Sequence, residues 1–157
     1  NKEKTTFFVL DSATQAKALV KDTLTSLGIK FNININEDIS VIGYPGEFSQ
    51  VILNLIANAK DAFASSDTDN RHIDITAYNS DSFAEITVKD NAGGIDEHIF
   101  ERIFEPYFTT KHQAQGTGLG LYMAKMIIEQ SMGGSIWVKN IDGGAQFTIR
   151  IPYEAVA

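Results

Sequence analysis

Two glycine-rich segments contain the residues best suited to binding an anion. The first is Asp90-Asn91-Ala92-Gly93-Gly94-Ile95, and the second, further along the chain, is Gly116-Thr117-Gly118-Leu119-Gly120-Leu121. Glycine lacks a Cβ and tolerates positive φ, so a phosphate chain can lie against bare backbone amides. The second segment also runs into a helical pattern, and the N-terminal amides of a helix attract anions. Together the segments indicate a nucleotide pocket, whereas one Gly-x-Gly-x-Gly alone is equally typical of a tight turn.

Polar side chains also recur along one face of a predicted helix. Asn54, Asn58 and Asp61 lie at positions i, i+4 and i+7, roughly opposite the apolar stripe of that helix. Asparagine is a poor helix former that costs about half a kcal/mol relative to alanine, so two in mid-helix indicate that their side-chain carbonyls are needed. An amide oxygen suits Mg2+, which takes its few protein contacts from such groups and the rest from water and phosphates. A solvated helix face is the alternative interpretation.

Three helices are predicted to position these groups. One spans residues 12–27 and ends at Gly28, which suits a left-handed cap, and a second begins at Pro45. The third, residues 119–132, is apolar on nearly every side and is therefore expected to be buried. The apolar stripe of the second helix consists of Phe48, Val51, Ile52, Leu55, Ile56, Ala59 and Phe63.

Alternating segments predict the strands of a sheet. Residues 30–36 alternate apolar and polar side chains, and residues 40–43 are expected to be a short partner. Residues 72–78 with 84–89 predict one antiparallel hairpin, and residues 136–139 with 145–151 predict another. One-sided strands need helices on their apolar face. The predicted fold is therefore α+β, a two-layer sandwich of a mixed, mostly antiparallel sheet with helices packed on one face.

Composition limits the function. The 157 residues, 43% hydrophobic and 21% charged, suit one domain over residues 1–157. A net charge of -7 argues against nucleic acid, and the absence of cysteine excludes disulfide and thiolate chemistry. No apolar run has the length of a signal peptide or membrane span, so we expect no direct membrane contact. The start at Asn1 indicates a fragment of a longer protein.

Taken together, four motifs resemble the ATP-binding catalytic domain of a sensor histidine kinase. This superfamily also includes type II topoisomerases, mismatch-repair ATPases and a heat-shock chaperone. The motifs occur in the family's order and spacing, and the resemblance covers nearly the whole chain. The matching stretches are residues 50–59 for the asparagine box, 90–95 for the first glycine box, 103–111 for the phenylalanine box and 116–121 for the second glycine box.

The resemblance implies ATP and Mg2+ as cofactors and assigns roles to single residues. Asn58, together with Asn54, would hold Mg2+, and Asp90 would accept a hydrogen bond from the exocyclic amine of adenine. Lys111 is the candidate cation near the terminal phosphate, although a solvated loop lysine is the alternative. A mobile lid, residues 95–115, would be anchored by Phe104 and Phe108. The other residues that we expect at the nucleotide are Asp61, Gly94, Ile95, Thr110, Gly116, Thr117, Gly118, Leu119, Gly120, Leu121 and Thr148.

Two positions depart from the family pattern. Ala92 stands where the family has its first glycine, and we expect its methyl group to be tolerated if the backbone there has negative φ. Asp61 stands where many kinases have a basic residue. Lys60 is next to it but points about 100 degrees elsewhere around the helix, so it is a poor substitute.

A third comparison concerns the reaction. Superfamily members that hydrolyse ATP carry a glutamate where this chain has Asn54, and an amide cannot take a proton at neutral pH. We therefore expect phosphotransfer to a histidine on a separate dimerisation domain of the same parent protein, and then to a response regulator. None of His72, His98 and His112 lies in a helix suited to an acceptor.

Location and alternatives follow from the same resemblance. We expect the domain to be the cytoplasmic part of a membrane-bound sensor. One alternative is a serine kinase of the anti-sigma-factor type, and another is a nonenzymatic module that senses ATP.

Overall fold

The computed structural model describes residues 3–108 and 118–153, and the account below concerns these residues. The main sheet has five strands in the order β2-β4-β5-β7-β6. β2 pairs with β4 in parallel and every other pairing is antiparallel, so the sheet is mixed, as predicted. The strands are β2 (Lys30–Ile35), β4 (His72–Asn79), β5 (Phe83–Asp90), β6 (Ser135–Ile141) and β7 (Gly144–Pro152).

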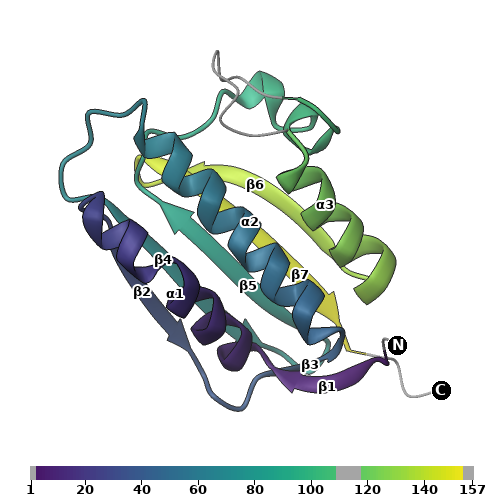
Figure 1. Ribbon diagram of the computed structural model, residues 1–157. Coiled ribbons are helices and arrows are strands. Elements are labelled where there is room, and N and C mark those ends of the chain that lie inside the picture. The colour runs from purple at the N-terminus through teal and green to yellow at the C-terminus, as the bar shows by residue number, and fades with distance from the viewer. Residues whose placement is uncertain (1–2, 109–117, 154–157) are drawn as a thin grey trace.

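The helices form a second layer on one face of this sheet (Figure 1). α1 (Val9–Ser26) lies over the β2 side, α2 (Pro45–Phe63) over the centre, and α3 (Gly120–Met126) over the β6 side. A π-helical stretch, η3 (Ile127–Ser131), continues α3 without a break. The predicted two-layer α+β fold is therefore confirmed. None of the described helices combines the length and apolar character needed to span a bilayer.

The apolar stripe predicted for α2 faces the sheet, and every residue of it is buried. Opposite it lie the buried side chains of the central strands, among them Ile73, Ile86 and Phe147. Each such side chain stabilises the fold by about 1.5–3 kcal/mol. Helix and sheet are therefore firmly joined, and the opposite face of α2 can hold polar groups in fixed positions.

The predicted pairing of residues 40–43 with residues 30–36 is wrong. β3 (Ser40–Gly43) instead pairs antiparallel with β1 (Thr5–Phe8) in a separate two-stranded sheet. This pairing buries Val41 and Phe7, and the Phe7 ring packs 5.6 Å from that of Phe48 on α2. β1 is followed directly by α1, which begins at Val9, ahead of the predicted start at Ser12.

The helix predicted to be buried over residues 119–132 is only partly buried. Only one stripe of α3 and η3 is buried, whereas Met123 is 46% exposed and Met126 is 40% exposed. The reason is position, because the main neighbours of this helix among the described residues are α2, residues 102–104 and β6, which leave Met123 and Met126 uncovered. The buried stripe consists of Ala124, Ile128 and Met132.

Candidate functional site

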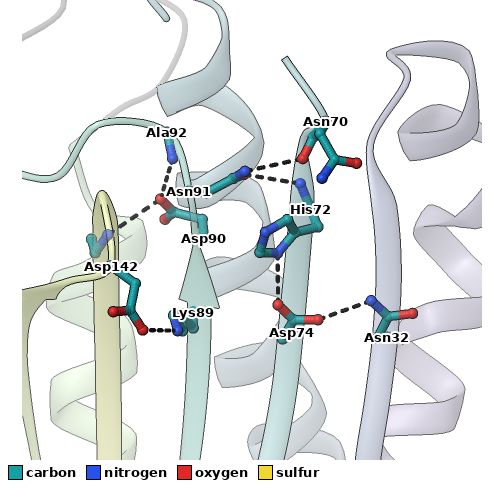
Figure 2. Close-up of polar contacts among 10 residues, drawn as sticks. Asn32, Asn70, His72, Asp74, Lys89, Asp90, Asn91, Ala92 and Asp142 are labelled. Carbon is teal, nitrogen blue, oxygen red and sulfur yellow. Dashed lines mark hydrogen bonds and ion pairs between the residues drawn. The ribbon is translucent and has the colours of Figure 1, made fainter. Parts of the chain in front are cut away.

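Asp90 ends β5 on the face of the sheet that the helices cover. Side chains alternate along β5, so Asp90 points to the same side as the buried Val88 and is itself only 3% exposed. Its Oδ1 accepts hydrogen bonds from the backbone N–H of Ala92 at 2.9 Å and of Ala145 at 3.3 Å (Figure 2). Within the described residues, no hydrogen bond reaches Oδ2. One carboxylate oxygen therefore fixes the side chain and the other remains an acceptor.

Burial raises the pKa of the Asp90 carboxyl above its ordinary value. The hydrogen bonds from Ala92 and Ala145 act in the opposite direction, as does the positive charge of a protonated His72. A desolvated carboxylate interacts strongly with a hydrogen-bond donor, because little water competes for it. Asp90 therefore suits the recognition of one buried N–H group.

The first glycine segment turns sharply beside Asp90. Gly93 and Gly94 have φ of 105° and 85°, and a Cβ on Gly94 would lie 2.7 Å from Oδ1 of Asn140. Ala92 is not among the residues with positive φ, so its methyl group meets the condition under which we expected it to be tolerated. Gly144 packs against the other side, since a Cβ there would collide with the Asp90 carbonyl oxygen. The chain is thus folded closely around the Asp90 backbone.

Asn140, near the end of β6, fixes the residue that follows these glycines. Its Oδ1 accepts the backbone N–H of Ile95 at 2.8 Å, and its Nδ2 donates to the Ile95 carbonyl at 2.7 Å. The side-chain amide thereby imitates a strand partner for one peptide unit. Local sequence patterns do not predict this contact, because Asn140 lies 45 residues after Ile95, just before a glycine turn.

A second asparagine, Asn91, holds the neighbouring strands together. Its Oδ1 accepts the N–H of His72 at 3.0 Å, and its Nδ2 donates to the Asn70 carbonyl at 3.0 Å (Figure 2). His72 in turn lies 2.7 Å from Asp74. These contacts join the start of β4 to the end of β5, so they support the position of Asp90.

On the polar face of α2, some side chains contact other residues, whereas the Asn58 amide makes no hydrogen bond to a described residue. Asn54 is fully engaged, because its Nδ2 donates to the Gly120 carbonyl at 3.0 Å and its Oδ1 accepts from Gln50 at 2.8 Å. Asp61 lies 3.8 Å from the ammonium group of Lys60, next to it in the chain. Asn58 therefore offers a free amide oxygen, whereas Asn54 joins α2 to the start of α3.

The donor set on α2 fits a magnesium ion that is shared with phosphates. A neutral amide oxygen is a suitable ligand, and Mg2+ usually takes only one or two ligands from the protein. No group of three His, Cys, Asp or Glu side chains suited to a metal occurs among residues 3–108 and 118–153. The described residues thus do not form a complete metal cage, and the phosphates would have to contribute ligands.

The segment between β5 and α3 is anchored at aromatic residues. It contains two short 3-10 helices, η1 (Glu97–Ile99) and η2 (Arg102–Phe104). Phe104 is buried edge-on against Phe147, with ring centroids 6.0 Å apart, and the Arg102 guanidinium lies 4.6 Å above the half-buried Phe108 ring.

The second glycine segment meets this anchored segment at Gly118. The Gly118 carbonyl accepts the N–H of Tyr107 at 2.8 Å, and a Cβ on Gly118 would lie 2.7 Å from the Tyr107 carbonyl carbon. Gly118 has φ of 73° and Tyr107 has φ of 67°, an unusual value for a residue with a side chain. Close backbone contact therefore requires a glycine at position 118.

Some of the other residues predicted to contact the nucleotide lie near the glycine segments, and some do not. Ile95, Leu119 and Leu121 are half-buried beside these segments, and a Cβ on Gly120 would meet nothing closer than 3.9 Å. The structure does not bring Thr148 to the site, because β7 points its side chain away from the helix-covered face, opposite to the neighbouring Phe147. Thr110, Lys111, Gly116 and Thr117 lie outside the described residues.

Two hollows on the surface lie away from Asp90 and Asn58. One, of about 530 Å³, lies between α1 and β2. The other, of about 540 Å³, lies at the start of α2 and is lined by Tyr44, Gln50, Met123 and Ile127, among others. Neither hollow is lined by Asp90 or Asn58. The hydrogen bonds and glycines around Asp90 therefore define the candidate site.

Known proteins share this arrangement of motifs. Residues 43–155 match a family model described as "Histidine kinase-, DNA gyrase B-, and HSP90-like ATPase". The two-component sensor PprA of Pseudomonas aeruginosa is 40% identical over 120 residues, which cover 74% of this chain and 13% of PprA. The sensor histidine kinase ZraS of Salmonella typhi is 42% identical over 147 residues, which cover 90% of this chain and 30% of ZraS. The chain thus spans between 13% and 30% of the length of these curated relatives.

Solved structures give the same result for the fold. The nucleotide-free catalytic domain of the histidine kinase ThkA superposes with a TM-score of 0.84 at 32% identity, over 96% of this chain and 97% of that domain. ThkA in complex with the response regulator TrrA gives a TM-score of 0.80 at 30% identity, over 98% of this chain and 42% of the ThkA chain. The residues matched by the family model, 43–155, include both glycine segments and α2.

Proposed function

Because the chain belongs to the family of histidine kinase-, DNA gyrase B- and HSP90-like ATPases, we propose that it binds ATP with Mg2+ and presents the γ-phosphate to a histidine on a separate domain. Its fold is that of a histidine kinase catalytic domain. The observation that supports the proposal best is the buried carboxylate of Asp90, which has one oxygen held by the backbone and the other open. The carboxylate lies beside Gly94 and Gly144, where the absence of a side chain lets neighbouring segments pack closely.

Adenine recognition follows from the open oxygen of Asp90. The exocyclic amine of adenine donates a hydrogen bond to Oδ2, whereas guanine presents a carbonyl at the equivalent position and is repelled. A charge-assisted hydrogen bond of this kind contributes about 1.5–3 kcal/mol. Gly94 leaves space for the base because it has no side chain, and Asn140 holds the next peptide unit in place.

The phosphates lie toward α2 and the second glycine segment. Gly118 and the start of α3 offer backbone amides, and Asn58 supplies an amide oxygen for Mg2+, which neutralises phosphate charge when it is bound. Asn54 keeps α2 and the start of α3 in register through the Gly120 carbonyl. Lys111 stays a prediction for the terminal phosphate, since it lies outside the described residues.

Transfer is favoured over hydrolysis because of the group at position 54. Its amide cannot act as a general base, and both of its polar atoms are already engaged with Gln50 and Gly120. The domain therefore positions the γ-phosphate and neutralises its charge, and the acceptor histidine supplies the nucleophile. We propose that this histidine lies in a dimerisation domain of the parent protein and that the phosphoryl group passes on to a response regulator, since ThkA was solved with such a protein.

Exposed apolar side chains suited to contact with the acceptor domain occur along α3 and at Tyr107. Tyr107 is 73% exposed, and the Met123 and Met126 side chains also project from the surface. Methionine adapts its shape to a partner, and exposed apolar groups of this size commonly mark protein contacts. Because the Tyr107 backbone is joined to Gly118, a domain docked here would lie close to the second glycine segment.

A labelling experiment tests the proposal. The chain is titrated with ATP and GTP in the presence of Mg2+, and then incubated with γ-labelled ATP and the histidine-bearing domain of the parent protein. We expect strong preference for ATP, no label on the chain alone, and an acid-labile label on the partner. An acid-stable label would support a serine kinase instead, and tight binding without any transfer would support an ATP-sensing module. Equal affinity for ATP and GTP would refute the role of Asp90.

A further inference from the structure

A basic groove runs between α1 and β2. These two elements lie on the side of the sheet farthest from α3 (Figure 1). It has a volume of about 530 Å³, and its floor includes the buried side chains of Leu24 and Ile29 and the half-buried ring of Phe31. Three lysines line the groove. Lys17 and Lys21 lie on α1, whereas Lys30 begins β2, where its side chain alternates with that of Phe31 and points to the opposite face of the sheet.

The positive charge of this groove contrasts with the rest of the molecule. The chain carries a net charge of -7, yet no carboxylate in the described part of the chain forms an ion pair with any of the three lysines. Lys17 and Lys21 are one turn apart on α1, and Lys17 Nζ lies 5.8 Å from the centre of the Phe31 ring. Asp22 follows Lys21 but points about 100 degrees away around the helix.

The groove lies beside a free strand edge. β2 is the last strand of the five-stranded sheet and pairs on one side only, with β4. The N–H of Lys30 donates to the Arg71 carbonyl, so the backbone of Lys30 faces β4. Because backbone groups alternate along a strand, those of Phe31 and Ile33 face away from β4 and have no strand partner among the described residues.

We propose that this groove binds an extended acidic segment of a partner protein, which adds to the free edge of β2 and places a carboxylate at every second position beside Lys17 and Lys21. Main-chain hydrogen bonds to an exposed strand edge supply affinity in this binding mode, and alternate side chains supply specificity. The side chains of an added strand that point toward the helix layer would lie beside α1, where both lysines are.

Charge distinguishes this partner from other occupants. A second copy of the chain paired through its own β2 edge would bring lysine against lysine. A nucleic acid would be repelled by the net charge of -7 over most of the surface. A short segment with a few spaced carboxylates matches the two lysines that α1 contributes to the groove and adds little long-range repulsion.

A peptide in which threonine and glutamate alternate, labelled with fluorescein, serves as the probe. Fluorescence anisotropy should show saturable binding that weakens as salt is added. The double variant Lys17→Glu/Lys21→Glu should bind about tenfold more weakly, since two attractive charge pairs become repulsive. The matched control, Lys4→Glu/Lys139→Glu, changes the net charge equally at exposed positions outside the groove and should bind like the unmodified chain.

Two further peptides test separately whether binding depends on the carboxylates and on backbone pairing with β2. The same peptide with glutamine in place of glutamate should bind much more weakly, and N-methylation of alternate peptide amides should also weaken binding if the segment pairs with β2. Thermal unfolding and ATP titration establish that the variants are folded. The proposal is overturned if the acidic peptide does not bind, if both double variants bind it equally, if glutamine substitutes for glutamate, or if N-methylation has no effect.

Discussion

The substitution Asp90→Asn should separate nucleotide recognition from folding. Asparagine has nearly the same size, and its Oδ1 can keep the hydrogen bonds from the N–H groups of Ala92 and Ala145. Its second polar group donates, however, whereas the proposed contact with adenine requires an acceptor. The variant therefore loses one acceptor and one buried charge while the backbone contacts of the turn remain.

The two effects have opposite signs. Loss of a charge-assisted hydrogen bond should weaken ATP binding by about 1.5–3 kcal/mol, which corresponds to about tenfold to 150-fold. Burial raises the pKa of Asp90, so the folded state holds the carboxyl proton more tightly than the unfolded state does. The stability that this protonation contributes is fully present below the unfolded-state pKa and is lost as pH rises through the folded-state pKa. At neutral pH the ionised carboxylate therefore destabilises the fold, and the variant should be no less stable than the unmodified chain.

Calorimetric titration with ATP and thermal unfolding across pH measure the two quantities. For the unmodified chain, ATP affinity should fall as pH drops through the raised pKa of Asp90, because the protonated carboxyl loses its charge. The Asp90→Asn variant should show a flatter profile over the same range. The reasoning is refuted if ATP affinity is unchanged in the variant, or if its thermal midpoint at neutral pH falls together with affinity, since that would mean a structural role.

Three further substitutions test other parts of the site. Asn58→Ala should flatten the magnesium dependence of ATP binding in calorimetry and leave adenosine binding unchanged; an equal loss for adenosine would indicate a structural residue. Asn140→Ala removes both hydrogen bonds to Ile95, each contributing about 0.5–1.5 kcal/mol, and should speed amide exchange after Gly94. Unchanged exchange there would show that the contact does not hold this segment. Gly144→Ala places a Cβ against the Asp90 carbonyl and should destabilise the fold by about 1–3 kcal/mol in chemical denaturation, whereas an unchanged midpoint would contradict the close packing.

Local periodicity was enough to predict most of the fold. The stripe of α2 and the hairpins β4–β5 and β6–β7 arise from neighbouring residues, and all three follow the sequence pattern. The partner of β3 was not predictable in this way, because β1 is short and lies on the far side of α1 in the chain. Partial burial of α3 depends on what covers its outer face, and the apolar composition of the helix does not contain that information.

The site shows the same division between local and distant causes. Gly93, Gly94 and Gly118 have the positive φ that only glycine adopts readily, so the two segments could be found from residue type alone. The Asn140 contact with Ile95 joins residues distant in sequence and had no local signal. Thr148 could have been placed from the sequence, because the alternation that buries Phe147 directs the next side chain to the opposite face of the sheet.

Asn54 connects the chemistry of the site with its architecture. Its side chain donates to the Gly120 carbonyl and accepts from Gln50, so it uses both the donor and the acceptor of an amide. A carboxylate at this position would have no donor for Gly120 and would face the carbonyl oxygen with a negative charge, which is unfavourable. The contact with the Gly120 carbonyl therefore needs a donor at position 54, and the amide that supplies it in this chain cannot activate water. The proposed preference for phosphotransfer over hydrolysis is thus linked to the contact between α2 and the start of α3, as well as to the chemistry of the site.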